Sequence, residues 1–189
     1  GQRLAYQTLP NVLRVGIVGG NATVRFNKRT ALGFTGYAGL LDRTLMRGVE
    51  LENELLIQRR WPVNRSFGSV GLSGRIGFGL LEVSGEYALW LGDRVGQGMI
   101  VFVELEPAWG RFEFSARHYD LNFAPAHASA QASPRTIGGI RTRGEQGVRL
   151  LAKIQPVKQL GGRVTVDLNR SALLDIWDFD LSGSVRGRP

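Results

Sequence analysis

The chain contains no cysteine, and its only histidines are His118 and His127. Without cysteine it can form neither a disulfide framework nor a thiolate metal site. It also lacks any run approaching about 18 consecutive apolar residues, so the sequence predicts no transmembrane helix. This second absence does not exclude a membrane, because membrane strands give only a weak, alternating signal.

Residues suited to catalysis are equally sparse. His127 has no second histidine close by in sequence, and His118 lies near the end of an apolar strand face, so we expect no metal site. The glycine-rich segment 16–20 resembles a phosphate loop, but no helical pattern follows it. Glu104 and Glu106 form a carboxylate pair that we expect to meet arginines. We therefore expect no enzymatic activity and no cofactor.

Lysine is also scarce, although the formal net charge is +8. Only Lys28, Lys153 and Lys158 are lysines, so arginine supplies nearly all of the positive charge. Soluble β-domains usually place several lysines on their exposed edges. Arginine is better suited to fixed, bidentate pairing with carboxylates in a confined space. A biased genomic base composition would produce the same preference.

What the sequence has in abundance is strict alternation of apolar and polar residues. In the clearest example, residues 81–89, the apolar positions are odd-numbered and Glu82, Ser84 and Glu86 are even-numbered. A period of two predicts a β-strand with one apolar and one polar face. Similar patterns begin near Val18, Leu32, Val70, Met99, Phe112, Val148, Val164 and Trp177. The sequence predicts one all-β domain over residues 1–189, an antiparallel up-and-down meander of about 8–10 strands.

Three segments are less regular. Residues 1–13 contain an edge strand or an extension. Residues 49–60 alternate and favour a strand, although the same leucines could form one side of a short helix. Residues 120–143 form the one long connection, which we expect to be an external loop, because loops of such length are usually functional or mobile.

Aromatic residues favour a membrane barrel over a soluble domain. They cluster near the predicted strand ends, at Phe26, Tyr37, Trp61, Phe67, Phe78, Trp90, Trp109, Tyr119, Phe123 and Trp177. Amphipathic rings belong at the two water–lipid boundaries, so we expect an interfacial aromatic girdle of Tyr37, Trp61, Trp90, Trp109, Tyr119 and Trp177. The apolar faces also contain many Gly and Ala residues, where a packed core would need bulk. The alternative is a soluble β-sandwich or lipocalin-like binding domain with its apolar faces turned inward.

The lengths of the predicted connections also favour an outer-membrane barrel. If residues 49–60 form a strand, the short connections 42–48, 77–79, 107–110 and 156–162 lie at one rim. The other rim then carries 61–67, 91–98, 120–143 and 170–175, which are mostly longer. Short turns at one rim and long loops at the other are typical of outer-membrane barrels. The tight turn at 27–30 breaks this rule.

The polar faces carry equal numbers of positive and negative side chains. We expect them to face a lumen, either as a salt-bridge plug or as the wall of a wet pore. The basic members are Arg25, Arg75, Arg111, Arg117, Arg149, Lys153, Arg163 and Arg186, and the acidic members are Glu82, Glu86, Glu104, Glu106, Glu113, Asp167, Asp178 and Asp180. Simple pairing across the hairpin at Pro107 sets Glu106 opposite Arg111, and Glu104 near both Arg111 and Glu113.

Three passages resemble bacterial outer-membrane β-barrel proteins: RFEFSARHYDLNF at 111–123, GEQGVRLLAKIQP at 144–156 and RVTVDLNR at 163–170. The resemblance implies a place in the bacterial outer membrane and a role as a passive pore or as a membrane-embedded scaffold subunit of an envelope assembly. It implies the lipid bilayer, lipopolysaccharide and other envelope subunits as partners. Such barrels often end in a closing strand with a terminal aromatic, which residues 186–189 lack, so we expect either a segment of a larger barrel or one subunit of an assembly.

A last group of basic residues lies in predicted loops. Its members are Arg94, Arg135, Arg141, Arg143 and Arg170. Such residues could attract anions such as lipopolysaccharide phosphates, or simply be solvated. We do not expect nucleic acid as a partner.

Overall fold

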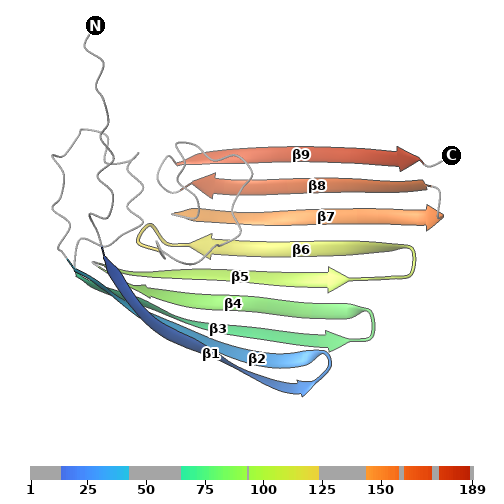
Figure 1. Cartoon of the computed structure of the whole chain (residues 1–189). Coiled ribbons are helices and arrows are strands. Elements are labelled where there is room, and N and C mark those ends of the chain that lie inside the picture. The colour runs from blue at the N-terminus through green and yellow to red at the C-terminus, as the bar shows by residue number, and fades with distance from the viewer. Residues whose placement is uncertain are drawn as a thin grey trace, which may run out of the picture.

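A computed structural model describes residues 14–42, 65–92, 94–123, 144–157, 160–171 and 175–187. Over these residues the chain forms one sheet of nine antiparallel strands in sequence order, without helices (Figure 1). The described residues therefore contain no helix able to cross a membrane. The predicted all-β meander is confirmed, and its nine strands are compatible with a segment of a β-barrel. The predictions for residues 1–13 and 49–60 lie outside the described residues.

The strands are long and similar in length, 10 to 13 residues each. They are β1 Val15–Asn27, β2 Thr30–Leu41, β3 Ser66–Phe78, β4 Leu81–Leu91, β5 Val95–Leu105, β6 Gly110–Tyr119, β7 Glu145–Val157, β8 Leu160–Ser171 and β9 Ile176–Gly187.

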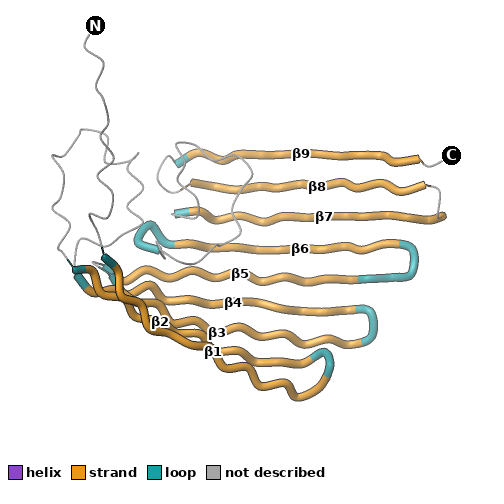
Figure 2. Tube along the Cα trace, viewed as in Figure 1, coloured by secondary structure: helices purple, strands orange, loops and turns teal. Residues whose placement is uncertain are grey.

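The two rims of the sheet differ in the length of their connections (Figure 2). The short-turn rim carries 28–29, 79–80, 106–109 and 158–159, and the long-loop rim carries 42–65, 92–94, 120–144 and 172–175. Because β2 pairs directly with β3, residues 42–65 form one connection, and the turn at 27–30 joins the short ones. Two connections at the long-loop rim, 42–65 and 120–144, are far longer than any at the short-turn rim, but 92–94 and 172–175 are no longer than 106–109. The predicted asymmetry therefore rests on two connections, and the predicted position of 42–48 at the short-turn rim was wrong.

Local chemistry explains the tight turns. The side chain of Asn27 accepts a hydrogen bond from the backbone N–H of Arg29 at 2.8 Å, an arrangement in which asparagine closes a turn on itself. Gly79 has a φ of 57°, in the left-handed region that costs glycine nothing. Both turns lie at the short-turn rim.

Strand register brings the apolar positions onto one face. One cross-strand row runs from Val103 through Phe114, Leu150 and Val166 to Leu181, each directly opposite the next. Side chains alternate between the faces of a sheet, so the neighbouring positions form a second face. We call the two the apolar face and the polar face.

The apolar face is more exposed than the centre of the polar face. On the apolar face, Val185 is 82% exposed and Val18 is 75% exposed, whereas on the polar face Arg117 is 3% exposed and Asp167 is 2% exposed. The sheet curls, with β1 and β2 turned away from the plane of the later strands (Figure 1). The polar face is therefore enclosed at its centre, around Arg117 and Asp167, whereas the apolar face is bare.

The sheet is not closed over the described residues. There β1 pairs only with β2, and β9 pairs only with β8. Both are odd-numbered members of a meander, so they run in the same direction. The outer edges of β1 and β9 therefore present backbone groups without a strand partner among the described strands.

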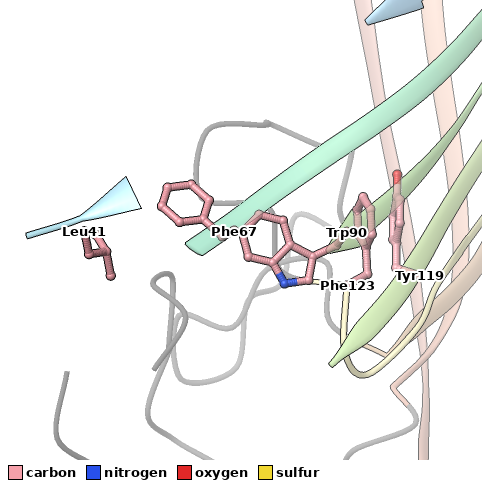
Figure 3. Packing of buried hydrophobic residues seen from close by; sticks show 5 residues of the cluster. All are labelled: Leu41, Phe67, Trp90, Tyr119 and Phe123. Carbon is pink, nitrogen blue, oxygen red and sulfur yellow. The ribbon is translucent and has the colours of Figure 1, made fainter. Parts of the chain in front are cut away.

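The only sizeable apolar cluster of buried side chains in the described part of the chain lies at the long-loop rim, on the polar face. It consists of Leu41, Phe67, Trp90, Tyr119 and Phe123 (Figure 3). We call it the rim cluster. The rings of Phe67 and Trp90 lie 5.7 Å apart, and those of Tyr119 and Phe123 stack at 5.7 Å. These distances are typical of favourable aromatic pairs.

Candidate functional site: the charged polar face

The sequence-predicted charged residues share one face, as register and alternation require. All of the predicted positions within strands, from Arg25 on β1 to Arg186 on β9, belong to the polar face. Glu106 lies just after β5, in the turn at the short-turn rim. That this face lines a lumen stays a prediction.

The centre of the polar face is a buried ionic group built around Arg117. Its side chain is fully buried, and its Nη2 donates to Asp167 Oδ1 at 2.8 Å while its Nε donates to Glu145 Oε1 at 2.5 Å. The two carboxylates come from β7 and β8, so this guanidinium ties three strands together. Charge-assisted hydrogen bonds of this kind are the strong ones in proteins.

Glu145 was not among the predicted residues. It precedes the regular alternation of β7, and its partner Arg117 lies on the far side of the long connection 120–144. Its position two residues before Gly147 and four before Arg149 places it on the polar face. That parity is the signal in the sequence that could have identified it.

Several polar atoms around this group have no hydrogen-bond partner among the described protein atoms. They are Ser115 Oγ, Arg117 Nη1, Arg149 Nε and Asp167 Oδ2. Ser115 lies directly opposite Arg149, which in turn lies opposite Asp167. Buried polar atoms in native proteins are nearly always bonded to protein or to water. The centre of the polar face is thus chemically suited to contact with water.

A second ionic group lies beside it, towards the short-turn rim. Glu82, Glu104 and Glu113 stand directly opposite one another on β4, β5 and β6, forming an acidic row. Arg111 Nη2 bridges two of them, at 2.6 Å from Glu104 Oε2 and 3.4 Å from Glu113 Oε2. The predicted position of Glu104 near both Arg111 and Glu113 is confirmed, whereas Arg111 pairs with Glu104 and Glu113 and not with Glu106 among the described contacts. Arg75 Nε approaches Glu82 Oε1 only to 4.0 Å.

A basic row follows at the short-turn rim. Arg111, Lys153 and Arg163 stand directly opposite one another on β6, β7 and β8. With Arg186 they line a groove of about 880 Å³ beneath the turn between β5 and β6. The predicted charges are balanced in number, but six of them form one acidic and one basic row, while Arg117, Arg149 and Asp167 form a mixed group between the rims.

The predicted aromatic girdle divides between the two faces. Trp177 on β9 is 61% exposed on the apolar face, and Trp109 is 50% exposed in the turn before β6. Tyr37, Trp90 and Tyr119 lie on the polar face instead, within or against the rim cluster. A girdle requires rings on the apolar surface, and these three do not line that surface. Trp61 lies outside the described residues.

Other predicted residues lie near the long-loop rim. His118 Nε2 lies 3.1 Å from Asp120 Oδ1, and Arg170 pairs with Asp175 and lies 5.9 Å from the Trp177 ring. Arg94 belongs to the connection between β4 and β5. In the described part of the chain no three His, Cys, Asp or Glu residues are grouped to hold a metal ion. His127, Arg135, Arg141 and Arg143 lie outside it.

Comparisons with known proteins give no match: no protein-family model, no curated protein and no solved structure is significantly similar to this chain.

Proposed function

We propose that the chain forms part of the wall of a β-barrel in the bacterial outer membrane, where it serves as a scaffold subunit of an envelope assembly or as part of a passive pore. The observation that carries the proposal is the bare apolar face. Its exposed residues extend over all nine strands, from Val18 and Phe34 to Phe114 and Leu181. Exposed hydrophobic areas of this extent mark contact with a membrane or a partner.

Strand length and rim asymmetry support the same proposal. A tilted strand needs roughly 9–11 residues to cross the hydrocarbon layer, and each of the nine strands has at least 10. Short turns at one rim and long loops at the other fit insertion in one direction. The buried ionic groups fit the polar interior of such a barrel.

The soluble alternative requires the reverse arrangement. A β-sandwich or lipocalin-like domain encloses its apolar face. Here Leu81 is 38% exposed and Leu72 is 52% exposed, while Arg117 and Asp167 are enclosed. Leaving so much apolar surface in contact with water is unfavourable, so this arrangement favours the membrane.

The open edges favour a scaffold over a self-contained pore. Unpaired sheet edges do not occur in the hydrocarbon region, because each unsatisfied backbone group costs several kcal/mol there. Direct pairing of β1 with β9 would place one parallel pair in an antiparallel barrel. Further strands, from this protein or from other envelope subunits, would complete the wall. The proposal includes contact with lipid and lipopolysaccharide but no catalytic role.

Lipid-resident quenching tests the proposal, and the absence of cysteine makes single labelling sites unique. Leu72→Cys and Leu150→Cys carry a fluorophore on the apolar face, and Ser73→Cys and Arg149→Cys are their neighbours on the polar face. In vesicles with brominated lipid we expect strong quenching at 72 and 150 and little at 73 and 149. Equal quenching at all four positions, or a chain that stays monomeric without detergent, would exclude the proposal.

Planar-bilayer conductance distinguishes the two roles. A scaffold subunit by itself should give no discrete current steps. Regular current steps of one size would show that the chain forms a pore.

A further inference from the structure

The basic row at the short-turn rim places like charges in direct opposition. Lys153 lies opposite both Arg111 on β6 and Arg163 on β8. Arg186 lies on the same face of β9, one alternate position beyond Ser184, which is opposite Arg163. Like charges directly opposite each other destabilise a sheet, so this row needs compensation.

Carboxylates compensate only one end of the row. Arg111 is held by Glu104 at 2.6 Å and by Glu113 at 3.4 Å. Lys153, Arg163 and Arg186 form no ion pair with any described residue. Three cations therefore line the groove without a carboxylate partner among the described residues, and Glu106 is the only carboxylate in the described lining.

The groove is shaped by backbone irregularities. Its volume is about 880 Å³, and its walls include the turn 106–110 and the bulged end of β7 between Ile154 and Val157. The Ser184 side chain adds a hydroxyl beside Arg163. Two guanidinium groups, one ammonium and one hydroxyl supply donors along an open groove.

We propose that this groove binds a phosphate-bearing anion. Guanidinium groups match the geometry of phosphate oxygens in pairs, and lysine adds a point charge. A single carboxylate would leave most of these donors unused, whereas a phosphate or pyrophosphate group has enough oxygens for all of them. The groove lies on the polar face but at a rim, so the phosphate belongs either to a soluble compound or to a lipid headgroup reaching over the rim. The proposal goes beyond the barrel function and does not depend on lipid contact at the apolar face.

Calorimetric titration with inorganic pyrophosphate tests it, using the full chain in uncharged detergent at constant ionic strength. The test variant is Lys153→Gln with Arg163→Gln. The matched control is Arg25→Gln with Arg94→Gln, which removes the same charge at exposed positions away from the groove. We expect at least about tenfold weaker binding for the test variant, because each charged hydrogen bond contributes a factor of this order, and unchanged binding for the control.

Arg163→Lys keeps the charge but loses bidentate geometry, so we expect intermediate weakening. It also keeps the test decisive if the double variant folds poorly. Repeating the titration in vesicles with and without phosphatidylglycerol identifies the source. Competition by this lipid indicates a headgroup, and its absence indicates a soluble phosphate.

Equal affinity of the wild type, the test variant and the control would overturn the proposal, as would heat no larger than that of sodium chloride at the same ionic strength. Quenching at the apolar face is measured separately, so either proposal can fail without the other.

Discussion

The polar face is covered differently at the two rims of this sheet. At the long-loop rim, Trp90 and Tyr119 turn onto the polar face and are buried, at 4% and 3% exposure. At the short-turn rim, Trp109 is half exposed, and the polar face carries an open groove lined by Lys153 and Arg163. One end of the polar face is thus closed by apolar packing, and the other is open and cationic.

The comparison teaches that aromatic residues near strand ends are not one class. Phe26 and Phe78, at the short-turn rim, are 67% and 64% exposed on the apolar face, as interfacial rings should be. Phe67 and Trp90, at the opposite rim, belong to the rim cluster. Whether a terminal ring lies on the apolar face or packs on the polar face depends on its parity within the strand.

The largest effect is expected from a matched pair of tryptophans. Trp90→Ala should lower the free energy of unfolding by about 3–5 kcal/mol, because it empties a packed cluster. Trp109→Ala should cost less than about 1 kcal/mol, because the ring is half exposed and packs mainly on Phe112. Denaturant titration in one detergent measures both. Similar losses would mean that the two rims are packed alike.

The centre of the polar face between the rims should respond almost as strongly. Arg117→Met leaves Glu145 and Asp167 without their shared cation, and breaking a buried pair costs about 3–5 kcal/mol. Arg75→Gln is the control, since Arg75 and Glu82 are 4.0 Å apart and well exposed, so its cost should stay below about 1 kcal/mol. Denaturant titration measures both variants. An Arg117→Met protein as stable as the wild type would show that this ionic group does not stabilise the sheet.

A smaller effect distinguishes two glycines. A Cβ at Gly98 would lie 2.7 Å from the Phe123 ring and 2.9 Å from Tyr119, whereas a Cβ at Gly74 on the apolar face would meet nothing within 4 Å. Gly98→Ala should therefore destabilise by about 1–3 kcal/mol through overpacking. Gly74→Ala should be neutral or stabilise by up to about 1 kcal/mol. Thermal unfolding compares the stabilities of the two variants. A Gly98→Ala protein as stable as the wild type would show that the rings of the rim cluster shift to accommodate the added Cβ.

Much of the fold could be predicted from alternation alone. Residues 81–89 indicated both the strand and its two faces, and the position of Glu104 near Arg111 and Glu113 followed from a tight hairpin. These are local properties, set by neighbours within a few residues. The same alternation places Trp90 on the face of Glu86 and Tyr119 on the face of Arg117, so parity predicts the face of these rings better than aromatic type does.

Contacts across long connections could not be predicted. Arg117 meets Glu145 across 28 positions and Asp167 across 50, and no periodicity indicates which strands will adjoin after a loop such as 120–144. The direct pairing of β2 with β3 across residues 42–65 was missed for the same reason.

The sequence by itself determined that this protein has strands with one apolar and one charged face, because side chains of consecutive residues must point to opposite sides of a strand. Only the tertiary structure decided that the centre of the charged face is enclosed, that an acidic row and a basic row lie towards the short-turn rim, and that one rim is closed by rings while the other is open. Those outcomes depend on register and curl, which fix which residues of different strands stand opposite each other.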